Sequence, residues 1–393
     1  MILPEAAWRT RPGLSELTAV LGAADSRFVG GAVRDTWLGL PVSDIDIATR
    51  HTPGQVMELL GRAGIRVVPT GLAHGTVTAL TDGGPVEVTT LRRDVATDGR
   101  HAVVAYTDDW RVDASRRDFT INALYADPAT GELFDYFGGI ADLNAGRVRF
   151  IGDPLRRIGE DHLRILRFFR FHARFGEAVD ADGLAACTAR ANDQMALSRE
   201  RIAAELLKLL VARHAVATMQ LMVEHGILAA VLPEIDAAGT DRLARLAQAE
   251  LACAIAPDAI RRLAVLIPPD VAERVGARLK LSNADRRRLE SATAGPGHEG
   301  PLGLAYRVGS AMAIDRLLIA GEDPTPVIDW VPPARPVGGG ALVALGIAKG
   351  PDVARGLKMV EARWIAEGFP DADRVEAITG EVAAQILGGA IIA

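Results

Sequence analysis

The stretch that decides the fold reads FVGGAVRD at residues 28–35, and SDIDIA follows it at residues 43–48. Residues 27–29 are typical of a short strand that runs into a glycine turn and then into one or two helical turns. Residues 44–48 alternate polar and apolar side chains, which predicts a strand with one wet face. Paired glycines between a strand and a helix let the backbone approach a ligand closely, and the helix start favours a phosphate.

Asp44 and Asp46 are two residues apart on this predicted strand, so both are expected on the same face. Mg²⁺ needs only one or two protein carboxylates together with substrate phosphates, so the pair is a candidate magnesium site for phosphoryl transfer. Glu87, on a later predicted strand, is a candidate third carboxylate. The alternative is a solvated edge strand whose charges discourage aggregation.

Outward from this stretch, the first 150 residues mix strand and helix signals. A helix is expected from Pro53 to Arg62, strands at 65–69, 76–80 and 86–91, and a hairpin turn at TDGG, residues 81–84. From about residue 155 the apolar spacing becomes helical and strand alternation nearly disappears. The sequence therefore predicts an α/β head with a mixed or antiparallel sheet, followed by an all-α region.

Composition sets limits on the class of protein. The chain has 393 residues, 49% of them apolar, two cysteines and a net charge of −6. No apolar run reaches the 18 residues of a membrane helix and the first residues do not resemble a signal peptide, so a cytoplasmic protein without a membrane partner is expected. Residues 147–174 depart from the acidic average, with eight arginines against three acidic residues, and are the expected phosphate-binding region.

Further motifs lie downstream, namely RRDFTINA at 116–123, DYFGG at 135–139, EDHLR at 160–164 and SRERI at 198–202. Together with GGAVRD and SDID, they resemble in order and spacing the class II tRNA nucleotidyltransferases, or CCA-adding enzymes, and the related bacterial poly(A) polymerases. Both groups belong to the polymerase-beta-like nucleotidyltransferase superfamily. The resemblance covers roughly residues 27 to 210 and is thin beyond them.

This resemblance implies roles for individual residues. It places metal ligands at Asp44 and Asp46, with Mg²⁺ as the expected ion and Glu87 as a possible helper. It places nucleotide contacts at Gly30, Gly31, Arg34, Arg117, Asp161, Arg164, Arg167 and Arg170. It also implies three parts: a catalytic head at 1–150, a helical base-selecting and RNA-binding neck at 151–235, and a helical body and tail contacting tRNA at 236–393.

Asp161 and Arg164 suit base selection by their chemistry. Cytosine and adenine both present an amino donor beside a ring-nitrogen acceptor, whereas uracil and guanine present the reverse. A carboxylate beside a guanidinium would therefore accept C and A. Drawn as one helix over 155–175, the sequence puts Phe168 and Phe171 in the same polar sector, where they would stack on a base. A solvated face with ion pairs is the alternative.

The implied reaction adds CCA to the 3′ end of tRNA from CTP and ATP, with release of pyrophosphate, and needs no obligate protein partner. Poly(A) synthesis and CC-only or A-only addition are the alternatives. Residues 93–109 keep the flexible loop that CC-only enzymes lack, although His101-Ala102 stands where a basic residue and a proline are expected. A non-catalytic RNA-binding module would have lost Asp44 and Asp46, and a transferase acting on proteins or drugs would not need Asp161 and Arg164.

Overall fold

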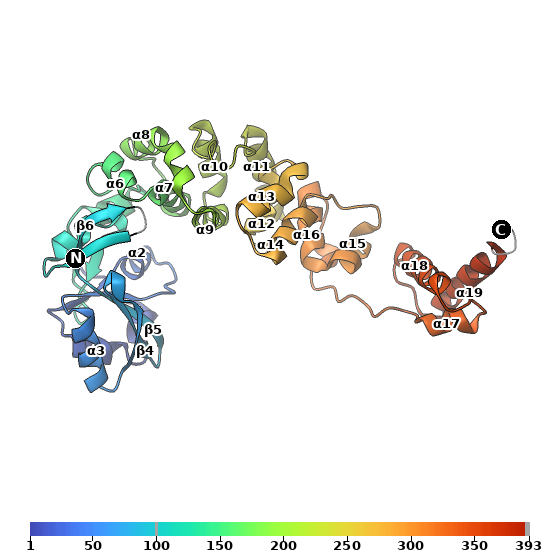
Figure 1. Cartoon of the computed structure of the whole chain (residues 1–393), viewed down its shortest axis with the longest axis horizontal. Coiled ribbons are helices and arrows are strands. Elements are labelled where there is room, and N and C mark those ends of the chain that lie inside the picture. The colour runs from blue at the N-terminus through green and yellow to red at the C-terminus, as the bar shows by residue number, and fades with distance from the viewer. Residues whose placement is uncertain (99–100, 390–393) are drawn as a thin grey trace. The chain divides into compact units, whose positions relative to one another are not determined.

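The computed structural model describes residues 1–98 and 101–389 (Figure 1). Contacts divide the chain into two compact units, Met1–Ala237 and Ala238–Ala393. The first unit holds an α/β head followed by helices, and the second contains helices and no strand among its described residues. The expected fold class is confirmed, while the three-part division near residues 150 and 235 stays a prediction.

The head is built on a seven-stranded sheet in the order β3-β4-β5-β2-β1-β8-β9. β2 and β5 are parallel, and the other neighbours are antiparallel. The strands of this sheet are β1 Ser26–Val29, β2 Asp46–Thr49, β3 Arg66–Gly71, β4 Thr76–Thr81, β5 Gly84–Thr90, β8 Leu124–Ala126 and β9 Leu133–Asp135. A separate two-stranded ladder is formed by β6 Arg92–Asp98 and β7 His101–Tyr106.

Local signals account for much of the head. The helix α3, Pro53–Arg62, has the predicted bounds because Thr52 and Gln55 form a capping box and Pro53 occupies the first turn. The turn predicted at residues 81–84 joins β4 to β5, with Thr81 opposite Gly84. An added Cβ on Gly83 would lie 2.8 Å from the carbonyl oxygen of Pro12, so only glycine fits there.

The acidic strand is shorter than the alternation predicts. β2 begins at Asp46, and Asp44 precedes it. The neighbouring strand β1 ends at Val29 because the chain turns at Gly30, with φ of +70°, into the helix α2, Gly31–Trp37. β1 therefore offers no partner at the level of Asp44, although β5 extends back to Gly84 on the other side of β2.

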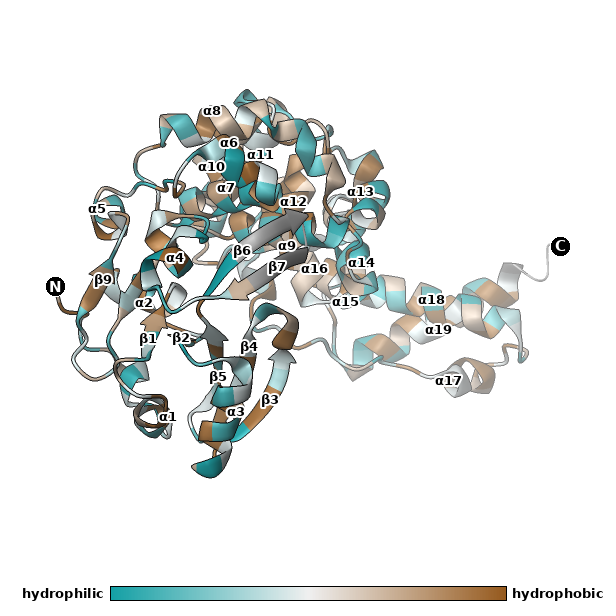
Figure 2. Cartoon of the chain, turned by 60° about the vertical axis from the view of Figure 1, so that its left-hand side comes forward, coloured by the Kyte–Doolittle hydropathy of each residue, from teal (hydrophilic) through white to brown (hydrophobic). Residues whose placement is uncertain are grey.

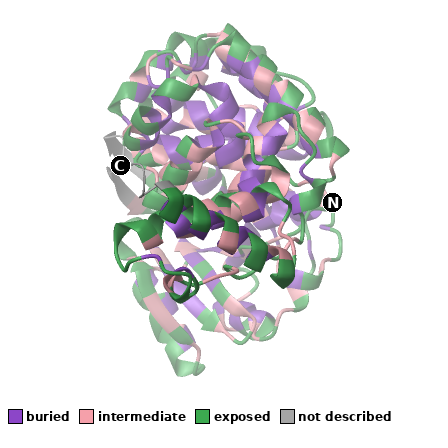
Figure 3. Ribbon diagram, turned by 90° about the vertical axis from the view of Figure 1, so that its right-hand side faces the viewer, coloured by how far each residue is buried: buried purple, intermediate pink, exposed green. Residues whose placement is uncertain are grey.

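Helices cover the sheet of the first unit and continue beyond it, and along each of them buried residues alternate with exposed ones (Figure 3). The remaining α-helices of this unit are α1 Leu14–Leu21, α4 Trp110–Ser115, α5 Gly139–Asn144, α6 Pro154–Glu160, α7 Leu163–Phe175, α8 Ala181–Ala189, α9 Arg199–Leu210 and α10 Ala215–Glu224. Short 3-10 turns lie at η1 Ala7–Thr10, η2 Leu72–His74, η3 Thr120–Asn122 and η4 Ala191–Ala196.

The single helix predicted over 155–175 is wrong, because the chain breaks between α6 and α7. Asp161 at the break has extended backbone angles, φ −153° and ψ 108°. Its carboxylate accepts hydrogen bonds from the backbone N–H of Leu163 at 3.1 Å and from Nη2 of Arg201 at 2.8 Å. These side-chain bonds replace the helical pattern at this residue.

The covering of α7 decides which of its aromatic side chains face the interior. Phe168 is fully buried and stacks on Phe150 with centroids 5.6 Å apart and an interplanar angle of 7°. The prediction that it stacks on a base is therefore wrong. Phe150 and Gly183 of α8 cover Phe168, although Arg164 and Arg167 are its neighbours on the helix. Phe171 is buried too, but its ring borders the cavity described below.

The second unit is formed by helices whose hydrophilic and apolar residues occupy different faces, as α18 and α19 show in Figure 2. Its α-helices are α11 Ala237–Ala252, α12 Ala259–Leu266, α13 Ala272–Arg278, α14 Asn283–Ala292, α15 Gly300–Val308, α16 Ser310–Ala320, α17 Gly339–Ala344, α18 Pro351–Ala366 and α19 Ala372–Gly389, with 3-10 turns at η5 Pro269–Val271 and η6 Thr325–Val327. None of the described helices is both long and apolar enough to span a membrane.

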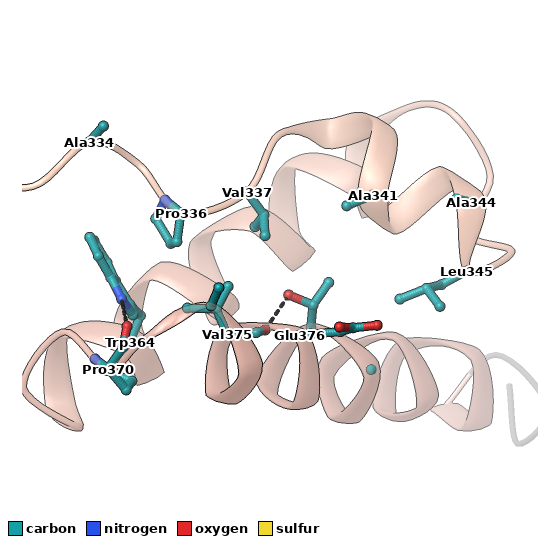
Figure 4. Close-up of a pocket in the computed structure, with 13 residues that line it drawn as sticks. Ala334, Pro336, Val337, Ala341, Ala344, Leu345, Trp364, Pro370, Val375 and Glu376 are labelled. Atoms are coloured by element: carbon teal, nitrogen blue, oxygen red, sulfur yellow. Dashed lines mark hydrogen bonds between the residues drawn. The ribbon is translucent and has the colours of Figure 1, made fainter.

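Two features of the second unit bear on function. Arg288 is the last of three consecutive arginines, at residues 286–288. It donates to the fully buried Asp315 at 2.7 Å and to Asp258 at 2.9 Å. A mostly apolar hollow of about 670 Å³ lies beside α17 and α19 (Figure 4). Trp364 stands at one end of it and donates to the carbonyl oxygen of Pro370 at 3.1 Å. None of the predicted site residues lines this hollow.

Replacing Phe168 by alanine should lower the free energy of unfolding by about 3–5 kcal/mol, because it leaves a cavity between Phe150 and Phe119. Urea denaturation followed by circular dichroism measures this change. Met195→Ala, at a side chain on η4 that is 54% exposed, is the control and should change stability little. A Phe168→Ala protein of unchanged stability would contradict the buried position.

Candidate active site

A cavity of about 590 Å³ in the first unit collects the predicted site residues. It is lined by Gly30, Gly31, Arg34, Asp44, Asp46, Arg116, Arg117, Asp118, Asn122, Asp161, Arg164, Arg167, Arg170 and Phe171. Every predicted metal and nucleotide position lies on this wall except Glu87. The cavity thus unites the sheet edge, the glycine turn and the start of α7.

The carboxylates lie at the edge where β2 begins. Asp46 is half-buried and stands opposite Glu87 in the parallel β2–β5 ladder. Burial, the charge of Glu87 and the charge of Asp44 raise the pKa of Asp46 to about 6, although Arg117 acts in the opposite direction. Glu87 is exposed, so it influences Asp46 from beside the cavity rather than from its wall. This edge carries more negative charge than its surroundings neutralise.

The glycine turn lets an arginine lie beneath the cavity floor. At Gly30, an added Cβ would lie 3.3 Å from Nη1 of Arg117. Arg34, on α2, is buried and donates from Nε to Asp35 at 2.8 Å and from Nη1 to Oδ1 of Asn122 at 2.5 Å. Its Nη2 donates to no other described residue. Burial lowers the pKa of Arg34, although Asp35 acts in the opposite direction. An anion bound beside Arg34 would therefore stabilise its charged form.

The RRD motif supplies two more arginines and a buried carboxylate. Arg116 and Arg117 both pair with Asp113, a buried residue of α4, at 2.8 and 3.4 Å. Arg117 also donates from Nε to the hydroxyl oxygen of Tyr125 at 3.2 Å. These partners fix the two guanidinium groups at the cavity wall.

Asp118 joins the head to α7. Its Oδ2 accepts from Nε of Arg167 at 2.7 Å and lies 2.6 Å from Nη2 of the same ion-paired guanidinium. Its Oδ1 accepts from Asn122 and from the backbone N–H of Phe119, both at 2.9 Å. Burial alone would raise the pKa of Asp118, but Arg167 and these hydrogen bonds hold it well below its usual range. Asp118 is therefore an ionised acceptor whose bonds are all directed within the protein.

Asp161 and Arg164 approach the cavity from the break between α6 and α7. Asp161 is oriented by Arg201 of α9, as described above. Arg164 donates from Nη1 to Glu160 at 2.6 Å and to the carbonyl oxygen of Arg157 at 2.8 Å. The Nε and Nη2 groups of Arg164 bond no other described residue, so they stay open toward a ligand.

The wall is completed farther along α7. Arg170 donates from Nε to Glu205 of α9 at 2.5 Å, and its guanidinium carbon lies 4.0 Å from the centroid of the Phe171 ring. Arg34 and Arg167 also lie near this ring, at 5.1 and 5.3 Å. Through Arg201 and Glu205, α9 thus holds Asp161 and Arg170 in place.

Three wall residues were not assigned from the sequence, namely Arg116, Asp118 and Asn122, whereas Phe171 was expected to stack on a base and lies on the wall. All three belong to the RRDFTINA motif, so the signal was present, but nothing local indicated that Asn122 would reach the same cavity. The expected flexible loop at 93–109 contains the β6–β7 ladder instead of irregular chain. Its tip, Gly99 and Arg100, lies outside the described residues, as do the side chains of His101 and Ala102.

Six arginines and four aspartates line this cavity. The arginines suit a polyphosphate, and the Asp44–Asp46 edge suits a divalent cation that such a phosphate also contacts. No cluster of three or more metal-ligating side chains occurs in the described part of the chain, so a cation at this edge would complete its shell with water or substrate oxygens.

Comparison with known proteins shows what the chain is similar to. Residues 26–149 match the poly A polymerase head domain, and residues 178–238 match the probable RNA and SrmB-binding site of polymerase A. The chain is 46% identical over 208 residues to the human mitochondrial CCA tRNA nucleotidyltransferase 1, an alignment that covers 51% of this chain and 48% of that protein. It is 41% identical over 188 residues to a CCA-adding enzyme of Latilactobacillus sakei, covering 47% and 46%.

The chain spans about half the length of the curated relatives that it matches. Solved structures extend the likeness in fold. The CCA-adding enzyme of Bacillus stearothermophilus in complex with CTP superposes with a TM-score of 0.75 at 25% identity, covering 96% of this chain and 99% of that one. The Thermotoga maritima enzyme complexed with tRNA has a TM-score of 0.71 at 19% identity, covering 99% of each chain. The head of the chain therefore matches the poly A polymerase head domain, and its fold is similar to that of solved CCA-adding enzymes.

Proposed function

We propose that the protein is a template-independent nucleotidyltransferase that adds CCA, from CTP and ATP, to the 3′ end of tRNA. The single observation that carries the proposal is the cavity, where an acidic edge, a group of arginines and the Asp161–Arg164 pair meet on one wall. Its relatives named as CCA-adding enzymes support the same reaction. The cytoplasm is the proposed location, although some of these relatives are mitochondrial.

The acidic edge fits a divalent cation. Nucleotidyltransferases of the polymerase-beta superfamily generally use divalent metals, and we propose Mg²⁺ held by Asp44 and Asp46. The elevated pKa of Asp46, about 6, reflects the carboxylates gathered there, and a dication would relieve that repulsion. When bound, the metal would polarise phosphate oxygens and favour the deprotonated hydroxyl.

The arginines would orient the nucleoside triphosphate. Arg34, Arg117 and Arg170 present donors on one side of the cavity, and each is fixed by a partner of its own. Asp161 would accept from the exocyclic amino group of cytosine or adenine while Arg164 donates to the ring nitrogen. Because Arg201 and Glu160 already hold these two side chains, base selection would cost little reorganisation.

In the proposed reaction, the 3′-hydroxyl oxygen of the RNA bonds to the α-phosphorus of CTP or ATP. The bond from that phosphorus to the bridging oxygen breaks, pyrophosphate leaves, and the hydroxyl proton passes to solvent. Positioning and charge stabilisation supply most of the acceleration in phosphoryl transfer. The chain contributes both through fixed guanidinium groups around the phosphates.

The proposal is tested with end-labelled tRNA lacking its 3′ CCA, incubated with Mg²⁺ and CTP, ATP or both. Growth by three nucleotides that needs both triphosphates is expected, and Asp46→Asn should slow it by about a thousandfold because a metal ligand is lost. Asp82→Asn, in the exposed β4–β5 turn, is the matched control. A long ladder with ATP alone would identify a poly(A) polymerase, a stop at two nucleotides a CC-adding enzyme, and no growth would contradict the proposal.

Base choice should depend on Asp161. Replacing it by alanine removes the acceptor for the amino group, so the preference for CTP over UTP in kcat/KM should fall by about 10- to 100-fold. Single-nucleotide incorporation measures the ratio. Asp182→Ala, exposed on α8, is the matched control, and an unchanged ratio in Asp161→Ala would remove this residue from base selection.

Metal affinity should depend on pH through Asp46. Since the pKa of Asp46 is raised to about 6, a cation must displace a proton below that pH, and affinity should fall about tenfold per pH unit. Above pH 7 it should level off. Calorimetric titration of Mn²⁺ between pH 5 and 8 tests this, and Asp46→Asn should abolish the dependence. Constant affinity of the unaltered protein from pH 5 to 7 would be inconsistent with a raised pKa.

A further inference from the structure

We propose that Asn122 is a positioning residue that couples triphosphate binding at Arg34 to base selection on α7. The inference rests on the proposed function and deepens it. Asn122 ends the short turn η3, is only 9% exposed, and lies between two elements that would contact opposite ends of the nucleotide. Its amide joins Arg34 on one side to Asp118 on the other.

The orientation of this amide is fixed by its neighbours. A guanidinium can only donate and an ionised carboxylate can only accept. Oδ1 of Asn122 therefore faces Nη1 of Arg34 at 2.5 Å, and Nδ2 faces Oδ1 of Asp118 at 2.9 Å. An amide is the one short side chain that satisfies both neighbours at once. An aspartate of the same shape would accept from Arg34 but oppose the Asp118 carboxylate.

From Asp118 the connection continues into α7. Oδ2 of Asp118 accepts from Nε of Arg167 at 2.7 Å and lies 2.6 Å from Nη2, so one carboxylate oxygen holds this edge of the guanidinium. Arg167 lies one helical turn beyond Arg164 and one before Arg170. A shift of Asp118 is therefore carried to the helix that presents the base-selecting guanidinium.

Arg34 lies at the other end of this series of contacts, where it can bind the triphosphate. Its Nη2 lines the cavity and bonds no other described residue, so it is available for a phosphate oxygen. Its Nε holds Asp35, and Asp35 in turn accepts from Nη2 of Arg174, also on α7, at 3.1 Å. Two bridges thus link Arg34 to the same helix, one at Arg167 and one at Arg174. A movement of Arg34 toward a phosphate would therefore be transmitted to α7 through both connections.

This coupling has a measurable consequence. If the triphosphate helps to set α7, then the preference for cytosine over uracil should be larger among triphosphates than among monophosphates, since two linked sites influence each other reciprocally. Removing Asn122 should reduce the triphosphate preference toward the monophosphate value. A residue that merely supports the fold would weaken all four nucleotides alike.

The test measures the dissociation constants of CTP, UTP, CMP and UMP for the full chain by calorimetry, without divalent metal. Asn122→Ala should weaken CTP about tenfold or more and narrow the CTP-to-UTP ratio, while the CMP-to-UMP ratio stays constant. Asn144→Ala is the matched control, because Asn144 also accepts a hydrogen bond through its side chain, from Trp37, but on the exposed end of α5.

The variant Asn122→Asp distinguishes a positioning role of Asn122 from a role that only supports the fold. Above pH 7 its carboxylate repels Asp118 and the CTP-to-UTP ratio should narrow as in Asn122→Ala. Once the pH is low enough to protonate the new acid, it can donate to Asp118, so the CTP-to-UTP ratio should recover relative to the unaltered protein at the same pH. If Asn122→Ala does not fold, this recovery of the CTP-to-UTP ratio in Asn122→Asp is sufficient to test the proposal.

Equal weakening of CTP and UTP by Asn122→Ala, or no recovery of Asn122→Asp at low pH, would overturn the coupling. Failure of the proposed function would look different. In that case the unaltered protein would bind none of the four nucleotides, or would not distinguish CTP from UTP.

Discussion

The ion pair between Asp118 and Arg167 is the interaction on which the site depends. It joins the turn after α4, in the head, to α7, and it belongs to a carboxylate whose two oxygens both have partners within the protein. A buried carboxylate left alone would cost several kcal/mol. Asn122, Arg167 and the Phe119 backbone satisfy it completely, so this ion pair ties the head to α7.

Around this pair the cavity keeps many like charges close together. Six arginines line one hollow, and each is held by an acidic, hydroxyl or carbonyl partner placed behind it, as Asp113 holds Arg116 and Glu205 holds Arg170. The partners stabilise the arginines without covering the donors that face the cavity. A protein with a net charge of −6 can in this way present a locally basic site.

The parts of the fold that local signals determine could be predicted, and those that depend on distant partners could not. The capped start of α3 and the β4–β5 turn need only neighbouring residues. The break at Asp161 involves Arg201, 40 positions away, and β1 turns away from β2 at Gly30. The burial of Phe168 depends on Phe150 and Gly183, which come from other parts of the chain and cover a face of α7 that its sequence makes polar.

The same distinction explains why the sequence motifs identified the residues of the cavity but not the role of each arginine. Arg157 and Arg164 are indistinguishable in a sequence that places both on one polar face. In the structure Arg157 is buried and donates to the carbonyl oxygen of Arg117 at 2.6 Å, whereas Arg164 keeps two nitrogen groups open. Which arginine supports the wall and which faces a nucleotide follows from the partners that the fold brings behind it. The proposed base selection without a nucleic-acid template requires such partners. The free energy of one or two hydrogen bonds distinguishes the right base from the wrong one only when the donors keep their geometry.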